Sequence, residues 1–120
     1  MGVLQVKRIY LAPAETDGCR ILVDRLWPRG ISKEKAELFS WAKEAAPSSD
    51  LRKQFHADHD FDAFTAAYQK ELENNPAASD LLAMVKEQLA KGNVTLVFGS
   101  KDEEHNNAPV LAAWLQSKLD

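Results

Sequence analysis

Three short hydrophobic segments of the chain predict β-strands. Residues 3–10 mix hydrophobic and polar side chains, so this strand is expected at an edge of the sheet or half exposed. Residues 21–23 are hydrophobic on both faces, which indicates a buried strand. Residues 94–98 are hydrophobic and partly β-branched, a composition typical of a strand, and they end at Gly99.

Hydrophobic residues at intervals of three and four predict helices between and after these strands. Ser32 is a good N-cap for a helix that should run to about Ala45 before Pro47 stops it. A last helix is expected after the polar residues 100–107. The N-caps expected for three intervening helices are Ser48 or Ser49, Asp60, and Asn75 followed by Pro76.

The order of these elements predicts an α/β fold, with residues 1–120 forming a single domain. We expect a small, mainly parallel sheet of about three to four strands with several flanking helices. About seventy residues separate strands 21–23 and 94–98, a distance that favours parallel pairing through a right-handed crossover over a hairpin and leaves open whether the two strands are neighbours. If they are neighbours, their following loops should meet at the carboxyl edge of the sheet, where open α/β sheets bind ligands.

The composition indicates a soluble domain without a general attraction to polyanions. The formal net charge of the 120 residues is -3, so nucleic acid is not expected as a partner. The longest hydrophobic stretches are far shorter than the roughly 20 residues that span a bilayer, so no membrane is expected either. Cys19 is a single cysteine, expected as a small core residue, and the first residues lack a signal-peptide pattern. We therefore expect a cytoplasmic location.

The segment after the second strand contains the candidate binding residues. Two arginines, a tryptophan and a Pro/Gly turn follow one another at residues 25–30, a mixture that core packing does not require. Guanidinium forks beside an aromatic ring suit a planar or phosphate-like anion. We expect a small anionic molecule to bind here and to contact the polar loop 100–107. The predicted binding residues are Arg25, Trp27, Arg29, Lys33, Lys101 and Asn106.

The polar loop also contains candidate catalytic residues. His105, with Asp102, is the candidate acid–base pair because an imidazole transfers protons near neutral pH. Ser100 adds the alternative of a hydrolase with a serine nucleophile. The Gly-x-Ser-x-Gly turn that positions such a serine is missing, which argues against this alternative.

Residues 56–59 resemble a metal-ligand cluster, with two histidines and an aspartate in four positions. However, Asp58 and Asp60 are natural helix caps, and no cysteine or second histidine pair completes a tetrahedral set. Capping is therefore the better interpretation. We expect neither a metal site nor a cofactor.

The chain resembles the YeaO-like family, also called domain of unknown function 488. The most specific segment is Val-Asp-Arg-Leu-Trp-Pro-Arg-Gly at residues 23–30, and the resemblance covers nearly the whole chain. It implies a compact, cytoplasmic, bacterial α/β protein whose activity is not established. Phe98 stands where the family pattern suggests a tyrosine, which removes a phenol from the expected site. The other matching segments are residues 6–10, 18–22, 32–34, 41, 46–48, 51–52, 64, 68, 71–72, 94–96 and 101–106.

Three functional hypotheses remain open at this point. The first is a domain that binds, or acts on, a small anionic metabolite at the carboxyl edge of the sheet. The second is an interaction module in which an exposed loop with Trp27 and Arg29 contacts a protein or nucleic acid, because interface anchors favour Trp and Arg. The third is purely structural, with Arg25 and Arg29 paired to loop carboxylates such as Asp24 or Glu104. The sequence leaves the oligomeric state open.

Overall fold

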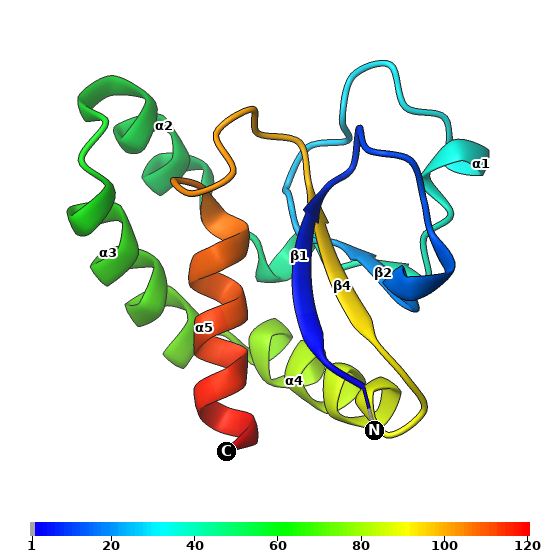
Figure 1. Cartoon of the computed structure of the whole chain (residues 1–120). Coiled ribbons are helices and arrows are strands. Elements are labelled where there is room, and N and C mark those ends of the chain that lie inside the picture. Colours follow the sequence, from blue (N-terminus) through cyan, green and yellow to red (C-terminus); the bar gives the residue numbers. More distant parts are fainter. Residues whose placement is uncertain (1) are drawn as a thin grey trace.

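The computed structural model describes residues 2–120, and four parallel strands form its centre (Figure 1). The strand order is β1-β4-β2-β3, so the first strand lies at an edge as expected. In register, Val94 of β4 lies between Leu4 and Cys19 of its two neighbours. The predicted α/β class and the parallel pairing of β2 with β4 are confirmed. The strands are β1 (Leu4–Arg8), β2 (Cys19–Leu22), β3 (Ser40–Trp41) and β4 (Val94–Phe98).

Within residues 2–120, five α-helices lie on the two faces of the sheet, and expected N-caps begin four of them, with Ser32 at the first. The Ser48 side chain accepts a hydrogen bond from the Leu51 N–H, and Asp60 and Asn75 cap the next two helices in the same way. Two short 3₁₀ turns, Glu15–Asp17 and Lys43–Ala45, complete the structure. The helices are α1 (Lys33–Ala36), α2 (Ser49–Asp58), α3 (Phe61–Glu73), α4 (Pro76–Leu89) and α5 (Asn107–Leu119).

The prediction of one helix from Ser32 to about Ala45 is wrong. Ser32 does cap a helix, but α1 is a single turn that ends at Glu37, whose backbone is left-handed with a φ of 48°. The chain then forms β3, which pairs with the free edge of β2. Phe39, which immediately precedes β3, is 56% exposed.

Both faces of the sheet are covered, and alternating side chains of the strands enter two separate cores. On one face, Leu96 and Phe98 pack against α2, α3, α4 and α5. On the other face, Leu22 and Val97 pack against Trp27 and the residues around α1. All five residues of β4 are buried, as befits a central parallel strand.

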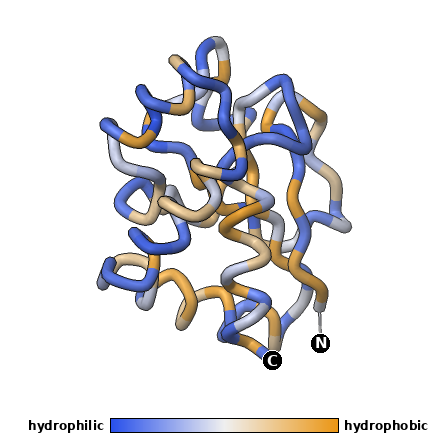
Figure 2. Tube along the Cα trace, turned by 90° about the vertical axis from the view of Figure 1, so that its left-hand side faces the viewer, coloured by the Kyte–Doolittle hydropathy of each residue, from blue (hydrophilic) through white to orange (hydrophobic). Residues whose placement is uncertain are grey.

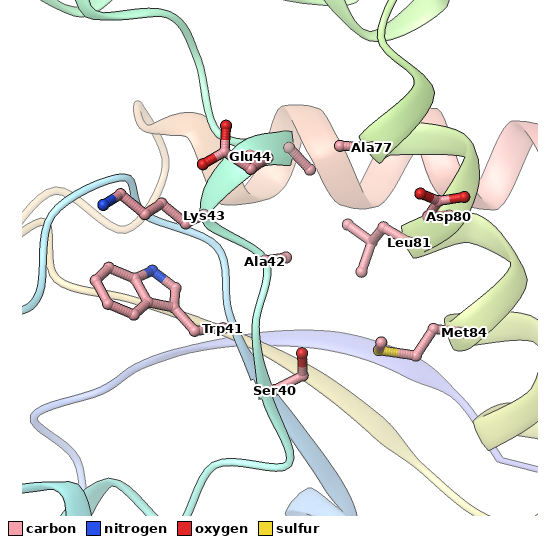
Figure 3. A pocket seen from close by; sticks show the side chains of 10 residues that line it. Ser40, Trp41, Ala42, Lys43, Glu44, Ala77, Asp80, Leu81 and Met84 are labelled. Atoms are coloured by element: carbon pink, nitrogen blue, oxygen red, sulfur yellow. The ribbon is translucent and has the colours of Figure 1, made fainter.

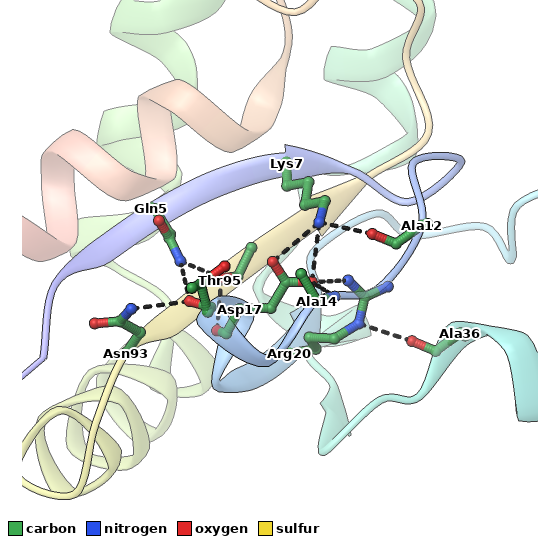
Figure 4. Close-up of polar contacts among 10 residues, drawn as sticks. Gln5, Lys7, Ala12, Ala14, Asp17, Arg20, Ala36, Asn93 and Thr95 are labelled. Atoms are coloured by element: carbon green, nitrogen blue, oxygen red, sulfur yellow. Dashed lines mark hydrogen bonds and ion pairs between the residues drawn. The ribbon is translucent and has the colours of Figure 1, made fainter.

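A buried polar cluster lies on the α1 face of the sheet, and we call it the Asp17 cluster (Figure 4). The Asp17 carboxylate accepts hydrogen bonds from Lys7 at 3.0 Å, from Arg20 at 2.7 Å and from the Ala14 N–H at 3.0 Å. Arg20 also donates to the Ala36 carbonyl at 3.0 Å. Burial raises the pKa of Asp17, but these donors outweigh it and hold the pKa below its usual value.

Hydrophilic stretches are frequent at the upper end of the molecule, where the strands finish, and hydrophobic stretches follow the strands and α5 (Figure 2). Within residues 2–120, no helix has the length and hydrophobicity needed to cross a membrane. The loops that follow the strands lie at this polar end of the molecule.

Candidate functional site

The loops that follow β2 and β4 meet at the carboxyl edge of the sheet. The Asp24 carboxylate accepts a hydrogen bond from the Gly99 N–H at 2.8 Å, although the two residues are 75 positions apart. The Asn107 side chain donates to the Val23 carbonyl at 2.9 Å and to Asp24 at 3.2 Å. Burial raises the pKa of Asp24, and these two donors offset the shift only in part. Asp24 therefore holds the two loops together.

A cavity of about 420 Å³ lies at this junction, and we call it the carboxyl-edge cavity. Its volume falls in the range of small-molecule sites, about 300–1,000 Å³. Residues 24–26 after β2, one side of α2 and the loop between β4 and α5 form most of its lining, and Pro47 and Phe64 of α3 complete it together with the start of α5. The first residue of α5 is among the lining residues, so the positive end of this helix dipole faces the region.

Arg25 lines the cavity and makes no ion pair within residues 2–120. Its Nε atom donates to the Pro47 carbonyl at 3.0 Å and its Nη2 atom to the Ala46 carbonyl at 3.2 Å. Both acceptors are neutral, so they hold the guanidinium in place without cancelling its charge. The pairing with a loop carboxylate, which the structural hypothesis required, is not present for Arg25.

Arg52 is a second arginine of the cavity, and the sequence analysis missed it. Its Nε atom is buried without a hydrogen-bond partner, and the side chain makes no ion pair in the described part of the chain. The start of α2 is held to α3, because the Ser48 N–H and hydroxyl donate to Glu71 at 2.9 and 2.6 Å. The Arg52 Nε atom itself is enclosed by protein atoms, so a ligand in the cavity can reach Arg52 only through the rest of its guanidinium group.

The remaining polar lining strengthens the positive character of the cavity. Lys101 and His56 are exposed side chains of its wall, and Asp24 is the carboxylate among the lining residues. The lining thus includes three cationic side chains, those of Arg25, Arg52 and Lys101, and one acidic side chain, that of Asp24. The sequence does contain a pattern that could have indicated the α2 part of the cavity. Arg52, Phe55 and His56 are spaced at i, i+3 and i+4, which places them on one face of a helix.

Hydrophobic side chains form another part of the lining. The rings of Phe55 and Phe64 have centroids 4.8 Å apart. Phe64 is buried and Phe55 is partly buried, so Phe55 is the more accessible ring. Leu26 lines the cavity and is 58% exposed. The cavity therefore combines cations with hydrophobic surface.

His105 lines the cavity, whereas Asp102 is not among the lining residues. The His105 Nδ1 atom lies 3.0 and 3.2 Å from the two Asp102 oxygens, and the ring packs edge-on against Phe61 at 5.1 Å. Asp102 also accepts hydrogen bonds from the backbone N–H groups of His105 and Glu104, which lower its pKa. Asp102 thus shapes the loop and orients the imidazole.

Two other polar residues of the loop are engaged in local contacts. The Ser100 hydroxyl donates to the Asp102 carbonyl at 3.2 Å and accepts from the Asp102 N–H at 3.1 Å, and it has no bond to His105. Asn106 is buried, accepts from the Ala108 N–H at 2.8 Å and donates to the Asp102 carbonyl at 2.8 Å. A serine–histidine pair is therefore not formed, and the Asn106 amide is committed to capping α5.

Trp27, Arg29 and Lys33 lie outside the carboxyl-edge cavity. The Trp27 indole N–H donates to the Ile31 carbonyl at 2.6 Å, and its ring meets Trp41 edge-on at 5.3 Å. Arg29 and Lys33 are exposed on the segment that covers the α1 face. Arg25 lines the cavity beside α2, whereas Trp27 packs with the core on the α1 face, so the chain passes from one face of the sheet to the other between these two residues. The structure thus brings together Arg25, Lys101, His105 and Asn106, and it separates Trp27, Arg29 and Lys33 from them.

A second hollow, of about 210 Å³, lies between α4 and the segment that contains β3 (Figure 3). Leu81 and Met84 of α4 face Ser40 and Ala42 across it, whereas the side chains of Trp41 and Lys43 extend to the other side of the segment. It contains none of the predicted site residues, and two carboxylates, Glu44 and Asp80, accompany its lysine. The carboxyl-edge cavity is larger and holds the uncompensated cations.

The histidine-rich segment 56–59 serves as a helix junction. His59 ends α2 in a left-handed conformation with a φ of 53°, and Asp60 caps α3 through its bond from the Ala63 N–H at 3.0 Å. Within residues 2–120, no group of three or more His, Cys, Asp and Glu side chains has a metal-binding arrangement. The capping role expected for Asp60 is confirmed.

Comparison with known proteins identifies the family. A family model described as the inactive DUF488-N3 subclade matches residues 3–120. The chain belongs to the YeaO-like DUF488 family. It is 43% identical over 115 residues to the uncharacterized protein YeaO of Escherichia coli (strain K12), which covers 95% of this chain and 97% of that protein. The resemblance carried by the 23–30 segment is thereby confirmed.

More distant members of the YeaO-like family have the same extent. The uncharacterized proteins Rv3073c of Mycobacterium tuberculosis (strain H37Rv) and Mb3100c of Mycobacterium bovis are each 35% identical over 116 residues. The matched region covers 96% of this chain and 95% of each relative. No solved structure matches the chain.

Proposed function

We propose that the chain binds a small anionic molecule in the carboxyl-edge cavity. One observation carries this proposal: Arg25 and Arg52 line the same cavity, and neither is paired with a carboxylate within residues 2–120. An anion between them would receive charge-assisted hydrogen bonds from both guanidinium groups. Lys101 and His105 are the proposed additional contacts from the opposite loop.

Two energy contributions bear on anion binding in this cavity. A buried donor without a partner costs about 1–3 kcal/mol, and the Arg52 Nε atom is such a donor. At an effective dielectric constant near 20, a unit-charge contact at 4 Å contributes about 4 kcal/mol, compared with about 1 kcal/mol in water. The enclosed Nε atom does not regain the first cost on binding, but an anion beside the two guanidinium groups would gain from the second contribution, which favours binding.

Binding without turnover is the version of this function that we favour. The matching family model is described as inactive, and the Ser100 hydroxyl is engaged with the backbone of Asp102. His105 is the group best placed to exchange a proton with a bound ligand, because its Nδ1 side is held by Asp102.

The alternative of an interaction loop with Trp27 and Arg29 has less support. The Trp27 N–H is bonded to Ile31, and the ring packs with the core on the α1 face. An anchor residue would need to be free to enter a partner.

We also propose a cytoplasmic location, because Cys19 is a free thiol whose pKa is raised by burial, as in an inert structural cysteine.

Thermal unfolding with a panel of small anions tests the proposal. We expect phosphate, sulfate or a simple carboxylate to raise the Tm of the wild type, by several degrees at a hundredfold excess over Kd, which adds about 2.7 kcal/mol. The double variant Arg25→Gln, Arg52→Gln should lose this shift. The matched control is Arg29→Gln, an arginine of the same loop outside the cavity, and it should keep it. Equal shifts in all three proteins would contradict the proposal, as would no shift with any anion.

A further inference from the structure

The hydrophobic part of the carboxyl-edge cavity exceeds what an inorganic ion requires. Leu26, Pro47, Phe55 and Phe64 line it together with the arginines. Leu26 is 58% exposed at this position, and Phe55 is only partly buried. Exposed hydrophobic side chains that gather in a hollow with a few polar groups are typical of a site for a partly hydrophobic ligand.

The charge and the ring surface are presented side by side. Arg52 and Phe55 are three positions apart on α2, and such neighbours have Cβ atoms about 5–6 Å apart. Both line the cavity, so the Arg52 guanidinium group and the accessible ring belong to one wall. This spacing suits an anionic group attached directly to a ring, with the anion at Arg52 and the ring at Phe55.

The volume of the cavity is sufficient for such a molecule. A hydrophobic cavity of about 150 Å³ accepts a benzene ring. The carboxyl-edge cavity, at about 420 Å³, has room for a ring, its anionic group and several water molecules. Leu26 and Phe55 provide hydrophobic contacts for the ring, and aromatic pairs add about 0.5–1.5 kcal/mol beyond the buried area.

We infer that the ligand is a small aromatic anion, in which a carboxylate or phosphate group is joined to a planar ring. This inference rests on the proposed function, because it specifies the class of anion that the same cavity binds. Arg25 and Arg52 contact the anionic group, and Leu26 and Phe55 contact the ring. Asp24 disfavours a second anionic group at its end of the cavity, because its carboxylate lines the same wall as Arg25.

Calorimetric titrations with matched pairs of anions test this inference. The pairs are phenyl phosphate with inorganic phosphate, and benzoate with acetate, each titrated into the wild-type protein. We expect the ring-bearing member of at least one pair to bind at least tenfold more tightly, which corresponds to about 1.4 kcal/mol. The pair with the larger ratio identifies phosphate or carboxylate as the preferred anionic group.

Two substitutions of the hydrophobic lining locate the ring. Leu26→Ser and Phe55→Ser should each bring the affinity ratio of the preferred pair towards one, and leave the affinity for the ion without a ring unchanged. Leu26 is exposed, so Leu26→Ser keeps the test valid if Phe55→Ser fails to fold. The matched control is Phe39→Ser, because Phe39 is 56% exposed and lies outside the cavity.

Each outcome decides between the inference and the function on which it rests. Equal affinity within both pairs overturns the aromatic ligand and leaves the proposed anion site intact. A ratio that survives both Leu26→Ser and Phe55→Ser overturns the inference as well, because the ring then binds elsewhere. Failure of all four anions to bind overturns the proposed function itself.

Discussion

The Asp17 cluster and the carboxyl-edge cavity both contain arginines, but the environments of these arginines differ. In the Asp17 cluster, Arg20 is 3% exposed and meets a carboxylate at 2.7 Å (Figure 4). In the cavity, Arg25 donates to neutral carbonyls, and within residues 2–120 neither Arg25 nor Arg52 is paired with a carboxylate. One guanidinium nitrogen of Arg20 and one of Arg52 are buried without a hydrogen-bond partner, so the difference between the two regions lies in the counter-charge. The comparison shows that the charge of Arg20 is compensated within the fold, whereas a ligand could compensate the charges of Arg25 and Arg52 beside the cavity.

The position of each cluster agrees with this distinction. Arg20 precedes Leu22 by two positions on β2, so it lies on the same face of the sheet and is covered by α1 and its neighbours. Arg25 follows the carboxyl end of β2, at the edge where parallel sheets are open to ligands. The predictions below address the stability of the first region and the binding capacity of the second.

The largest expected effect is the loss of stability in Asp17→Asn. Removing this charge leaves Arg20 buried without a counter-charge, and breaking a buried ion pair costs about 3–5 kcal/mol. Urea unfolding measures the change. The control is Asp80→Asn, an exposed aspartate on α4, for which we expect a change within about 0.5 kcal/mol. Similar values for both variants would show that the Asp17 cluster is not a structural ion pair.

The pH dependence of stability should reveal the same carboxylate. The folded-state pKa of Asp17 is lowered from 3.8, so its contribution is complete above that value and is lost as the pH falls through the lower folded pKa. The wild type should therefore lose stability more steeply than Asp17→Asn between about pH 5 and about pH 2. Parallel stability curves for the two proteins would contradict the lowered pKa.

A smaller loss of stability is expected for Asn107→Ala. The Asn107 amide donates to Val23 and Asp24, so its removal leaves two acceptors of the loop junction without this partner. Unmade hydrogen bonds at a partly buried site cost about 1–2 kcal/mol. Thermal unfolding gives the stability, and titration with phosphate gives the accompanying loss of affinity. An unchanged affinity would indicate that the cavity does not depend on the joining of the two loops.

The smallest expected change in stability belongs to Arg52→Met, which keeps the hydrophobic stem and removes the unpaired charge. We expect stability without ligand to be unchanged or to rise by up to about 1 kcal/mol, because a buried donor without a partner disappears. Anion binding should be weakened at least tenfold. Urea unfolding and calorimetry give the two values. A loss of several kcal/mol would place Arg52 with Arg20 among the structural arginines.

The sheet and most helices were predictable because their determinants are local. Asp60 and Asn75 are recognisable caps, and the hydrophobic content of residues 94–98 marks a central strand. The exception was the segment after Ser32, where helix-like spacing gave way to pairing with β2. The free edge of β2 is a tertiary feature, so the formation of β3 could not be predicted from the local sequence of residues 37–41.

The candidate site was predictable only in the part that lies on the two loops. Arg25 and His105 follow neighbouring strands, and the topology brings both to the cavity. Arg52 reaches the same place because α2, whose start is bonded to α3 through Ser48 and Glu71, lines the same cavity as the loops. Trp27 is close to Arg25 in sequence, but the chain crosses the sheet edge between them, and sequence proximity misleads there.

Chemical-shift mapping with phenyl phosphate tests the central claim, that a small anion binds between Arg25 and Arg52, most directly. In ¹⁵N-labelled protein, we expect saturable shifts for residues 24–26, 52–56 and 100–107, including the Arg52 side-chain Nε–H. The residues of the Asp17 cluster should remain unchanged and serve as the internal reference. Shifts confined to residues 27–33, or an Arg52 Nε–H resonance that does not move at saturation, would contradict the account.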